Sequence, residues 1–379
     1  MHIRLISACA LSGTIALGGW LSTPSVQAQG GAAAPAAKPA APAKRPLART
    51  PDGHPDIQGT YDVATITPIE RPEEFGNRAT LTADEATALE QGEAEWKAST
   101  LEADKGDRTA PPVGGETDKP KTYLATVLRR GGGVVGGYNT FWLAGGEQVV
   151  RIDGQYRTSI VVDPPNGRIP PLKPIAVERQ KARLQIRVDP SASESTAAAG
   201  PPSAFDNPEA RPLGERCILG FGNTSGPPTL PNYFYNNLKQ IVQTKDTILI
   251  HVEMVHDARI IRMNSTHLPK TVRKWMGDSI GRWEGETLVV DTTNFTDKTV
   301  FQGSGENLHV VERFTPQSDG GLLYQFTVSD PDTWDRSWKG EYVWRASNEQ
   351  IYEYACHEGN HGLVNVLRGA RYEDSQKKK

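Results

Sequence analysis

Residues Leu322–Ser329 read LLYQFTVS, and their apolar and polar side chains alternate along the chain. The apolar face carries Leu322, Tyr324, Phe326 and Val328. Because successive side chains of a β-strand point to opposite faces of the sheet, this period of two predicts a strand with one buried face. The run Trp338–Ala346 repeats the pattern, with Trp338, Tyr342 and Trp344 on one face. These two runs predict neighbouring strands.

Similar runs lie on both sides of this pair and are separated by turns such as Lys245-Asp246 and Glu284-Gly285. The full set is Leu238–Thr244, Thr247–Met254, Ala258–Met263, Ser279–Trp283, Thr287–Phe295, Leu308–Thr315, Leu322–Ser329, Trp338–Ala346 and Gln350–Cys356. Strands joined by short connections pair with their neighbours in antiparallel order. The order therefore predicts a mainly β fold, an up-and-down antiparallel meander of about eight to ten strands that forms a calycin-like barrel or a rolled sheet.

A barrel of this size has an interior that is either packed with side chains or open to one small molecule. Trp283, Tyr342, Trp344 and Glu353 are the side chains that we predict to contact a ligand there. Packing in the core is the alternative role of the aromatic side chains. The pattern favours a lipocalin-like function, in which a small apolar or aromatic molecule binds inside the barrel.

Residues 1–28 have the layout of a secretory signal peptide. Arg4 precedes an apolar stretch from Leu5 to Leu21, and Val26-Gln27-Ala28 predicts cleavage after Ala28. We therefore predict a periplasmic protein without stable membrane insertion, since no other segment is apolar enough to span a bilayer. Residues 29–50 are mostly Ala, Pro, Gly and Lys, a composition typical of a flexible linker.

Two cysteines, Cys217 and Cys356, remain after removal of the leader, which contains Cys9. An even number of cysteines in an oxidising compartment predicts a disulfide between them. This bond would connect the start of the meander to its last predicted strand. Two separate buried thiols are the alternative, and a redox pair is disfavoured because the chain lacks a Cys-x-x-Cys spacing.

The N-terminal region, residues 51–212, carries helix and hairpin signals, whereas residues 213–373 hold the meander and residues 374–379 form a tail. Thr82-Ala83-Asp84-Glu85 is a capping box that starts a helix extending to about Ala103. Its expected buried positions are Leu89, Trp96 and Leu101.

Four further local signals are present. Asp153-Gly154 predicts a hairpin turn between residues 147–152 and 156–162. A second helix is expected over Pro174–Arg183, and Asn360 is expected to cap a final helix. Residues 190–212 are rich in Ser, Ala and Pro, which indicates a surface loop.

Four motifs resemble those of a large group of secreted bacterial proteins that have no established activity. They are ERC at 215–217, EMVHDAR at 253–259, GRWEGETLVVDTTNF at 281–295 and YEYACHEGN at 352–360. The likeness extends from about Pro51 to Arg371, and it is carried by the WEGxTLVVDTTNF and EYACHEGN patterns in particular. Members of the group tend to carry an aromatic residue where this chain has His361. The resemblance implies family membership and no activity.

The segment Glu253–Arg259 gathers four titratable residue types at a predicted turn between two strands. Asp257 can orient His256, which can then act as a general base. Arg259 can bind a carboxylate or an oxyanion, and Glu253 completes this candidate catalytic set. A periplasmic enzyme of the hydrolase or proton-transfer type is therefore an alternative function. An exposed hairpin tip with a local salt bridge is the other interpretation.

Asp291, Glu312 and Glu353 are carboxylates within predicted strands. The pattern leaves open whether they point to solvent or into the barrel. Burial would raise their pKa values and make them candidate acid–base groups.

Two further patterns match known motifs by letter only. His357–His361 fits the zinc pattern His-Glu-x-x-His, but the intervening Gly359 and Asn360 place the histidines across a helix start. Residues 131–136, GGGVVG, fit a dinucleotide-binding pattern, but no helical period follows them. We therefore predict no metal and no cofactor.

The formal net charge of −3 gives no electrostatic basis for binding nucleic acid. The predicted partner is therefore a small molecule. If side chains fill the barrel, a non-catalytic envelope scaffold protein is the remaining candidate function.

Overall fold

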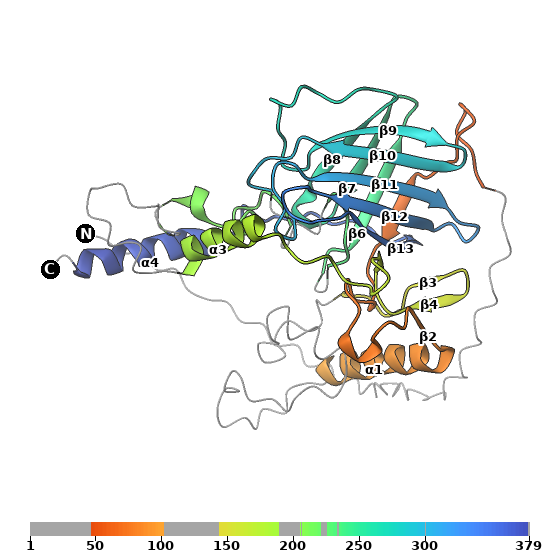
Figure 1. Cartoon of the computed structure of the whole chain (residues 1–379), viewed down its shortest axis with the longest axis horizontal. Helices are drawn as coiled ribbons and strands as arrows, with labels where there is room; N and C mark the ends of the chain where they lie inside the picture. Colours follow the sequence, from red (N-terminus) through yellow and green to blue (C-terminus); the bar gives the residue numbers. More distant parts are fainter. Residues whose placement is uncertain are drawn as a thin grey trace, which may run out of the picture. The chain divides into compact units, whose positions relative to one another are not determined.

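A closed barrel of nine strands forms the core of the computed structural model (Figure 1). The structure describes residues 47–101, 144–188, 205, 207–220, 226–232, 235–299 and 301–377. The strands are β1 (Gly59–Asp62), β6 (Leu238–Gln243), β7 (Thr247–Val252), β8 (Ala258–Met263), β9 (Asp278–Glu284), β10 (Thr287–Thr293), β11 (His309–Pro316), β12 (Leu322–Ser329) and β13 (Trp338–Ser347). Each pairs with the next in this order, and β1 also pairs with β13. The prediction of a mainly β barrel is confirmed.

The strand that closes the barrel comes from the N-terminal region. Thr60 and Tyr61 of β1 lie between β6 on one side and β13 on the other. The predicted strand Gln350–Cys356 is wrong, because these residues form no strand. The hydrogen-bonding edge of β13 is already occupied by β1 and by a short strand, β5 (Val161–Asp163).

One neighbouring pair departs from the predicted antiparallel order. Strands β8 and β9 run parallel, with Ile261 opposite Ser279. Parallel neighbours require a crossover connection, which residues 264–277 provide. The crossover is fastened at Asp278, whose carboxylate accepts hydrogen bonds from the backbone N–H of Leu268 (2.9 Å) and the guanidinium of Arg262 (2.9 Å).

Aromatic side chains fill the interior of the barrel. Those that are less than 2% exposed include Trp338, Trp344, Tyr324, Tyr342, Phe314 and Phe301. The ring centroids of Tyr324 and Trp344 are 5.0 Å apart, and those of Phe314 and Trp344 are 5.3 Å apart. Gly340 of β13 lies directly opposite Phe326 of the neighbouring strand β12. A Cβ atom at Gly340 would lie 2.2 Å from the Phe326 ring. Glycine at this position therefore makes room for the aromatic ring.

A chain of polar groups crosses this apolar interior. The Arg259 guanidinium donates to both carboxylate oxygens of Glu312, one of them at 2.9 Å. Tyr324 donates its hydroxyl to Glu312 (2.8 Å) and accepts from the backbone N–H of Thr229 (2.9 Å). Tyr342 donates to the Thr229 carbonyl (2.9 Å). Buried polar groups need such partners, and these bonds tie four strands, β8, β11, β12 and β13, to the segment that precedes β6.

A small helix-covered sheet lies outside the barrel. It consists of β2 (Thr80–Leu81), β3 (Arg151–Ile152) and β4 (Gln155–Arg157), and helix α1 (Ala83–Leu101) follows β2. The capping box is confirmed, since the Glu85 N–H donates to Thr82 Oγ1 (3.2 Å) and the Thr82 N–H donates to Glu85 Oε2 (2.8 Å). The Asp153-Gly154 turn is also confirmed, with positive φ angles at both residues.

Helices α3 (Pro174–Val188) and α4 (His361–Lys377) correspond to the other two predicted helices. Asn360 caps α4 as predicted, because its Oδ1 accepts from the Leu363 N–H at 3.2 Å. Short 3-10 turns cover Glu73–Phe75 (η1), Pro208–Ala210 (η4) and Met254–His256 (η6). Within the described residues, no helix combines the length and the apolar character needed to cross a membrane.

The predicted disulfide is confirmed. Cys217 and Cys356 are bonded, with their Cα atoms 5.7 Å apart. The bond fastens the chain after β13 to the segment before β6, across 139 residues of sequence. Loop-entropy arguments assign about 4–5 kcal/mol to a crosslink of this length.

Several predicted segments lie outside the described residues. They are the signal peptide (1–28), nearly all of the linker (29–50), the glycine-rich pattern (131–136) and most of the loop 190–212. The side chains of Trp96 and Leu101 are likewise outside the description.

We predict that Glu312→Ala lowers the free energy of unfolding by about 3–5 kcal/mol, because Arg259 would stay buried without its carboxylate. The double variant Arg259→Met/Glu312→Leu should recover most of the loss, since it removes both charges and fills the space. Guanidinium denaturation followed by tryptophan fluorescence measures both. Equal stability of Glu312→Ala and the native chain would contradict the assignment.

Candidate functional site

A cavity of about 1080 Å³ opens at one end of the barrel. It is lined by the end of β1, the start of β6, the residue after β7 and the end of β13. Residues 144–148 and 349–353 complete its wall. We call it the barrel-end cavity, and its characteristic side chains are Asp62, Tyr235, Glu253, Arg345 and Tyr352.

The barrel-end cavity has an acidic lining. Five carboxylates and two cations border it. Asp62 pairs with Arg345 (2.5 Å) and Glu147 with Lys97 (3.1 Å), which leaves the other three carboxylates uncompensated by either cation. Among the described residues, the carboxylates of Glu349 and Glu353 form no ion pair. An acidic lining disfavours anionic molecules and accepts neutral or cationic ones.

Glu253 is the most deeply buried carboxylate of this lining, at 7% exposure. It directly follows β7, and its Oε2 accepts a hydrogen bond from the Leu238 N–H at 3.1 Å. Desolvation raises the pKa of Glu253, although the Leu238 hydrogen bond and the nearby Lys239 charge oppose the shift. A raised pKa makes this carboxyl group a candidate proton donor.

Lys239 is close to Glu253, because it lies opposite Val252, the residue that precedes Glu253. It faces the barrel interior on β6, in register with Tyr61 of β1 and Val252 of β7. Its side chain is fully buried, and its Nζ has no hydrogen-bond partner among the described residues. Desolvation lowers the pKa of Lys239 to about 8, against the opposing effect of the Glu253 and Asp62 charges. The sequence pattern did not identify Lys239 as a buried or functional residue.

The turn after β7 holds two of the predicted catalytic residues but does not join them. Val255 and His256 have positive φ angles of 66° and 47°. His256 Nδ1 lies 2.9 Å from the Tyr354 carbonyl, whereas Asp257 Oδ1 accepts from the Ala258 N–H at 2.8 Å. Among the hydrogen bonds of the described residues, none links His256 to Asp257. Burial raises the pKa of Asp257.

Arg259 points away from this turn and into the barrel. Besides Glu312, its guanidinium contacts Ser279 Oγ (3.0 Å) and Thr292 Oγ1 (2.9 Å), and it is 4% exposed. The structure therefore separates Arg259 from His256, because Arg259 is buried inside the barrel whereas His256 is exposed in the turn. The role of this set as one catalytic unit remains a prediction without geometric support.

The predicted ligand contacts are also dispersed. Tyr342 and Trp344 are fully buried in the packed interior. Trp283 is partly buried and stacks on His54 with ring centroids 5.1 Å apart. Glu353 is exposed and borders the barrel-end cavity. Only Glu253 and Glu353 of the predicted site residues therefore line this cavity.

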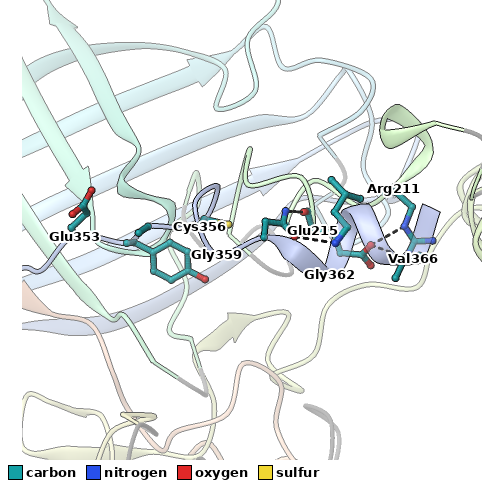
Figure 2. A pocket seen from close by; sticks show the side chains of 12 residues that line it. Arg211, Glu215, Glu353, Cys356, Gly359, Gly362 and Val366 are labelled. Atoms are coloured by element: carbon teal, nitrogen blue, oxygen red, sulfur yellow. Dashed lines mark hydrogen bonds and ion pairs between the residues drawn. The ribbon is translucent and has the colours of Figure 1, made fainter. Parts of the chain in front are cut away.

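A second cavity, of about 620 Å³, lies beside the disulfide. Figure 2 shows Arg211 and Glu215 next to helix α4, with Glu353 at the other end. Glu353 borders both cavities, so the two are neighbours. His357 and His361 are exposed, and only His361 belongs to α4. Within the described residues, no group of three or more His, Cys, Asp or Glu side chains is arranged to hold a metal ion.

The strand carboxylates divide between the two faces. Glu312 points inward, whereas Asp291 is on the outer face and accepts from His267 Nε2 and His309 Nε2, each at 3.0 Å. His267 Nδ1 also lies 3.2 Å from Asp278. The hydrogen bond to Asp291 raises the pKa of His309, and the same bond lowers the pKa of Asp291. This cluster fastens the crossover to β10 and β11.

No protein-family model matches the chain, and no curated protein matches its sequence. The resemblance to a group of secreted bacterial proteins therefore stays a prediction.

We predict that His309→Gln lowers the melting temperature more at about pH 5.5 than at about pH 9. The raised pKa of His309 means that its stabilising effect is complete below the ordinary histidine value of 6.5 and disappears as pH rises through the folded-state pKa. Thermal unfolding followed by circular dichroism tests this. His361→Gln, at an exposed position, is the control. An equal effect of His309→Gln at both pH values would contradict the ion pair.

Proposed function

We propose that the protein binds a small neutral or cationic organic molecule with an aromatic or apolar part at the barrel-end cavity. The observation that carries the proposal is the cavity itself, whose volume of about 1080 Å³ is near the upper end of the range for small-molecule sites. Tyrosines at its rim and a buried carboxylate at its base combine apolar contact with a directed polar group.

The ligand is placed at the end of the barrel because side chains fill the interior. A molecule inside would have to displace Tyr342 and Trp344, which are fully buried and in contact with their neighbours. Native interiors are close-packed, so opening such a space loses many contacts at once. This placement revises the predicted cavity inside the barrel.

A periplasmic location is part of the proposal. The disulfide between Cys217 and Cys356 supports it, because such bonds persist in oxidising compartments.

A non-catalytic envelope scaffold protein is the second candidate function, and the filled interior favours it. Hydrolase or proton-transfer chemistry by His256, Asp257 and Arg259 is less well supported, because Arg259 is committed to Glu312 inside the barrel. A measurement of ligand binding at the barrel-end cavity distinguishes the proposed binding function from these two alternatives.

We predict saturable binding of phenylnaphthylamine, a neutral fluorescent aromatic amine, with a dissociation constant on the order of 10 µM. Tyr352→Ala should weaken binding about fivefold or more, since the loss of one aromatic contact corresponds to roughly 1 kcal/mol. Tyr352 is 70% exposed, so this change should leave the melting temperature unaltered. Fluorescence titration of the full chain measures the affinity.

Tyr372→Ala is the matched control, because Tyr372 is 67% exposed on α4 and lies outside the cavity lining. Its affinity for the probe should equal that of the native chain. Absence of saturable binding, or equal loss in both variants, would count against a binding site here and in favour of the scaffold function.

A further inference from the structure

The least explained group in the described structure is the amine of Lys239. It is fully buried on the inner face of β6, and its Nζ has no hydrogen-bond partner among the described residues. An unpaired ammonium group in an apolar interior loses its hydration and gains no partner in return, which opposes folding. A buried polar group without a partner therefore calls for a functional or structural reason.

We propose that the Nζ of Lys239 forms an imine with the carbonyl carbon of a neutral aldehyde or ketone that enters the barrel-end cavity, with Glu253 as the proton donor. This inference rests on the proposed function, because it assigns a substrate class to the same cavity. The acidic lining fits it, since a neutral carbonyl compound meets no charge repulsion there.

The position of Lys239 connects it to the cavity. Its neighbour Leu238 lines the cavity and exchanges two hydrogen bonds with Glu253, from N–H to Oε2 (3.1 Å) and from the Glu253 N–H to the Leu238 carbonyl (3.2 Å). The charges of Lys239 and Glu253 also influence each other's ionisation. Lys239 is therefore near Glu253, but it points to the inner face and lies outside the cavity lining, so a molecule in the cavity can reach the amine only if the wall opens.

Access requires the turn after β7 to move. This turn contains Val255 at φ 66° and His256 at φ 47°, and a β-branched residue rarely adopts a left-handed conformation. A backbone held in such a conformation is strained, which marks this turn as the part of the cavity wall that can rearrange. A rearrangement of this turn that keeps the Glu253 carboxyl group next to Lys239 would open the cavity towards the amine.

The chemistry balances without an oxidant or reductant. The neutral Nζ attacks the carbonyl carbon, and a proton passes from nitrogen to oxygen to give a carbinolamine. The Glu253 carboxyl group then protonates the hydroxyl group, which leaves as water. A protonated imine remains beside the Glu253 carboxylate, so the two charges form a pair. Burial favours both reacting forms, the neutral amine and the protonated acid.

The test uses the full chain with benzaldehyde and cyanoborohydride at about pH 7, so that any imine is trapped as a stable benzylamine adduct. Peptide mapping by mass spectrometry locates it. At that pH the neutral fraction of Lys239 exceeds that of an ordinary lysine on the order of a hundredfold. We expect at least about tenfold more adduct at Lys239 than at Lys245, which is exposed in the β6–β7 turn.

Two variants test the roles of the residues. Glu253→Gln keeps an oxygen acceptor for the Leu238 N–H but removes the proton donor, and it should slow adduct formation at least about tenfold. Glu74→Gln changes an exposed carboxylate outside the cavity lining and should not. Adduct spread over exposed lysines with Lys239 unmodified, or equal rates in the two variants, would overturn the inference. The mapping on the native chain does not depend on the folding of any variant.

Benzyl alcohol separates this inference from the proposed function, because it has the same ring and no carbonyl group. Displacement of phenylnaphthylamine by the alcohol, without an adduct at Lys239, would overturn the imine and leave the binding site intact. Failure of both the alcohol and the aldehyde to displace the probe would overturn the binding site and the imine together.

Discussion

Closure of the barrel by β1 is the constraint on which the rest of the structure depends. A four-residue strand from the N-terminal region hydrogen-bonds to β6 on one side and to β13 on the other, so it joins the first and last strands of the meander. A closed sheet has no unpaired edges at which another chain could add. The register of β1 also places Tyr61 opposite Lys239 and Asp62 opposite Arg345. The end of the barrel, and the cavity there, are consequences of this one strand.

The filled interior explains why the polar chemistry lies at the end of the barrel. Large rings from β11, β12 and β13 occupy the space enclosed by the strands, and the inward pair Arg259–Glu312 is satisfied by Ser279, Thr292 and Tyr324. A buried ion pair with complete hydrogen bonding specifies one arrangement of its strands more than it adds net stability. We interpret it as an element of the core, because its two charges pair with each other and do not bind a ligand.

Local rules predicted much of this fold, and non-local pairing accounts for what they missed. Alternation identified β12 and β13, and turn and capping chemistry identified Asp153-Gly154 and Thr82–Glu85, because each signal lies within a few residues. β1 has no such signal, since its identity as a strand comes from partners at least 176 residues away in sequence. The Glu253–Arg259 segment shows the same limit. His256 lies in the exposed turn η6 and Arg259 points inward from β8, so the two residues are close in sequence but their side chains lie in different environments.

The same reasoning explains why the sequence did not identify Lys239 as a buried residue. A lysine in a run of alternating residues is normally assigned to the solvent face, and only the register with Tyr61 and Val252 shows that it points inward. Once inward, it differs from Arg259 in one physical respect, since Arg259 has a full set of acceptors and Lys239 has none among the described residues. The barrel thus contains two buried cations in contrasting states. The satisfied cation lies within the packed core, and the unsatisfied one lies next to the cavity wall, where a bound molecule can supply the missing partner.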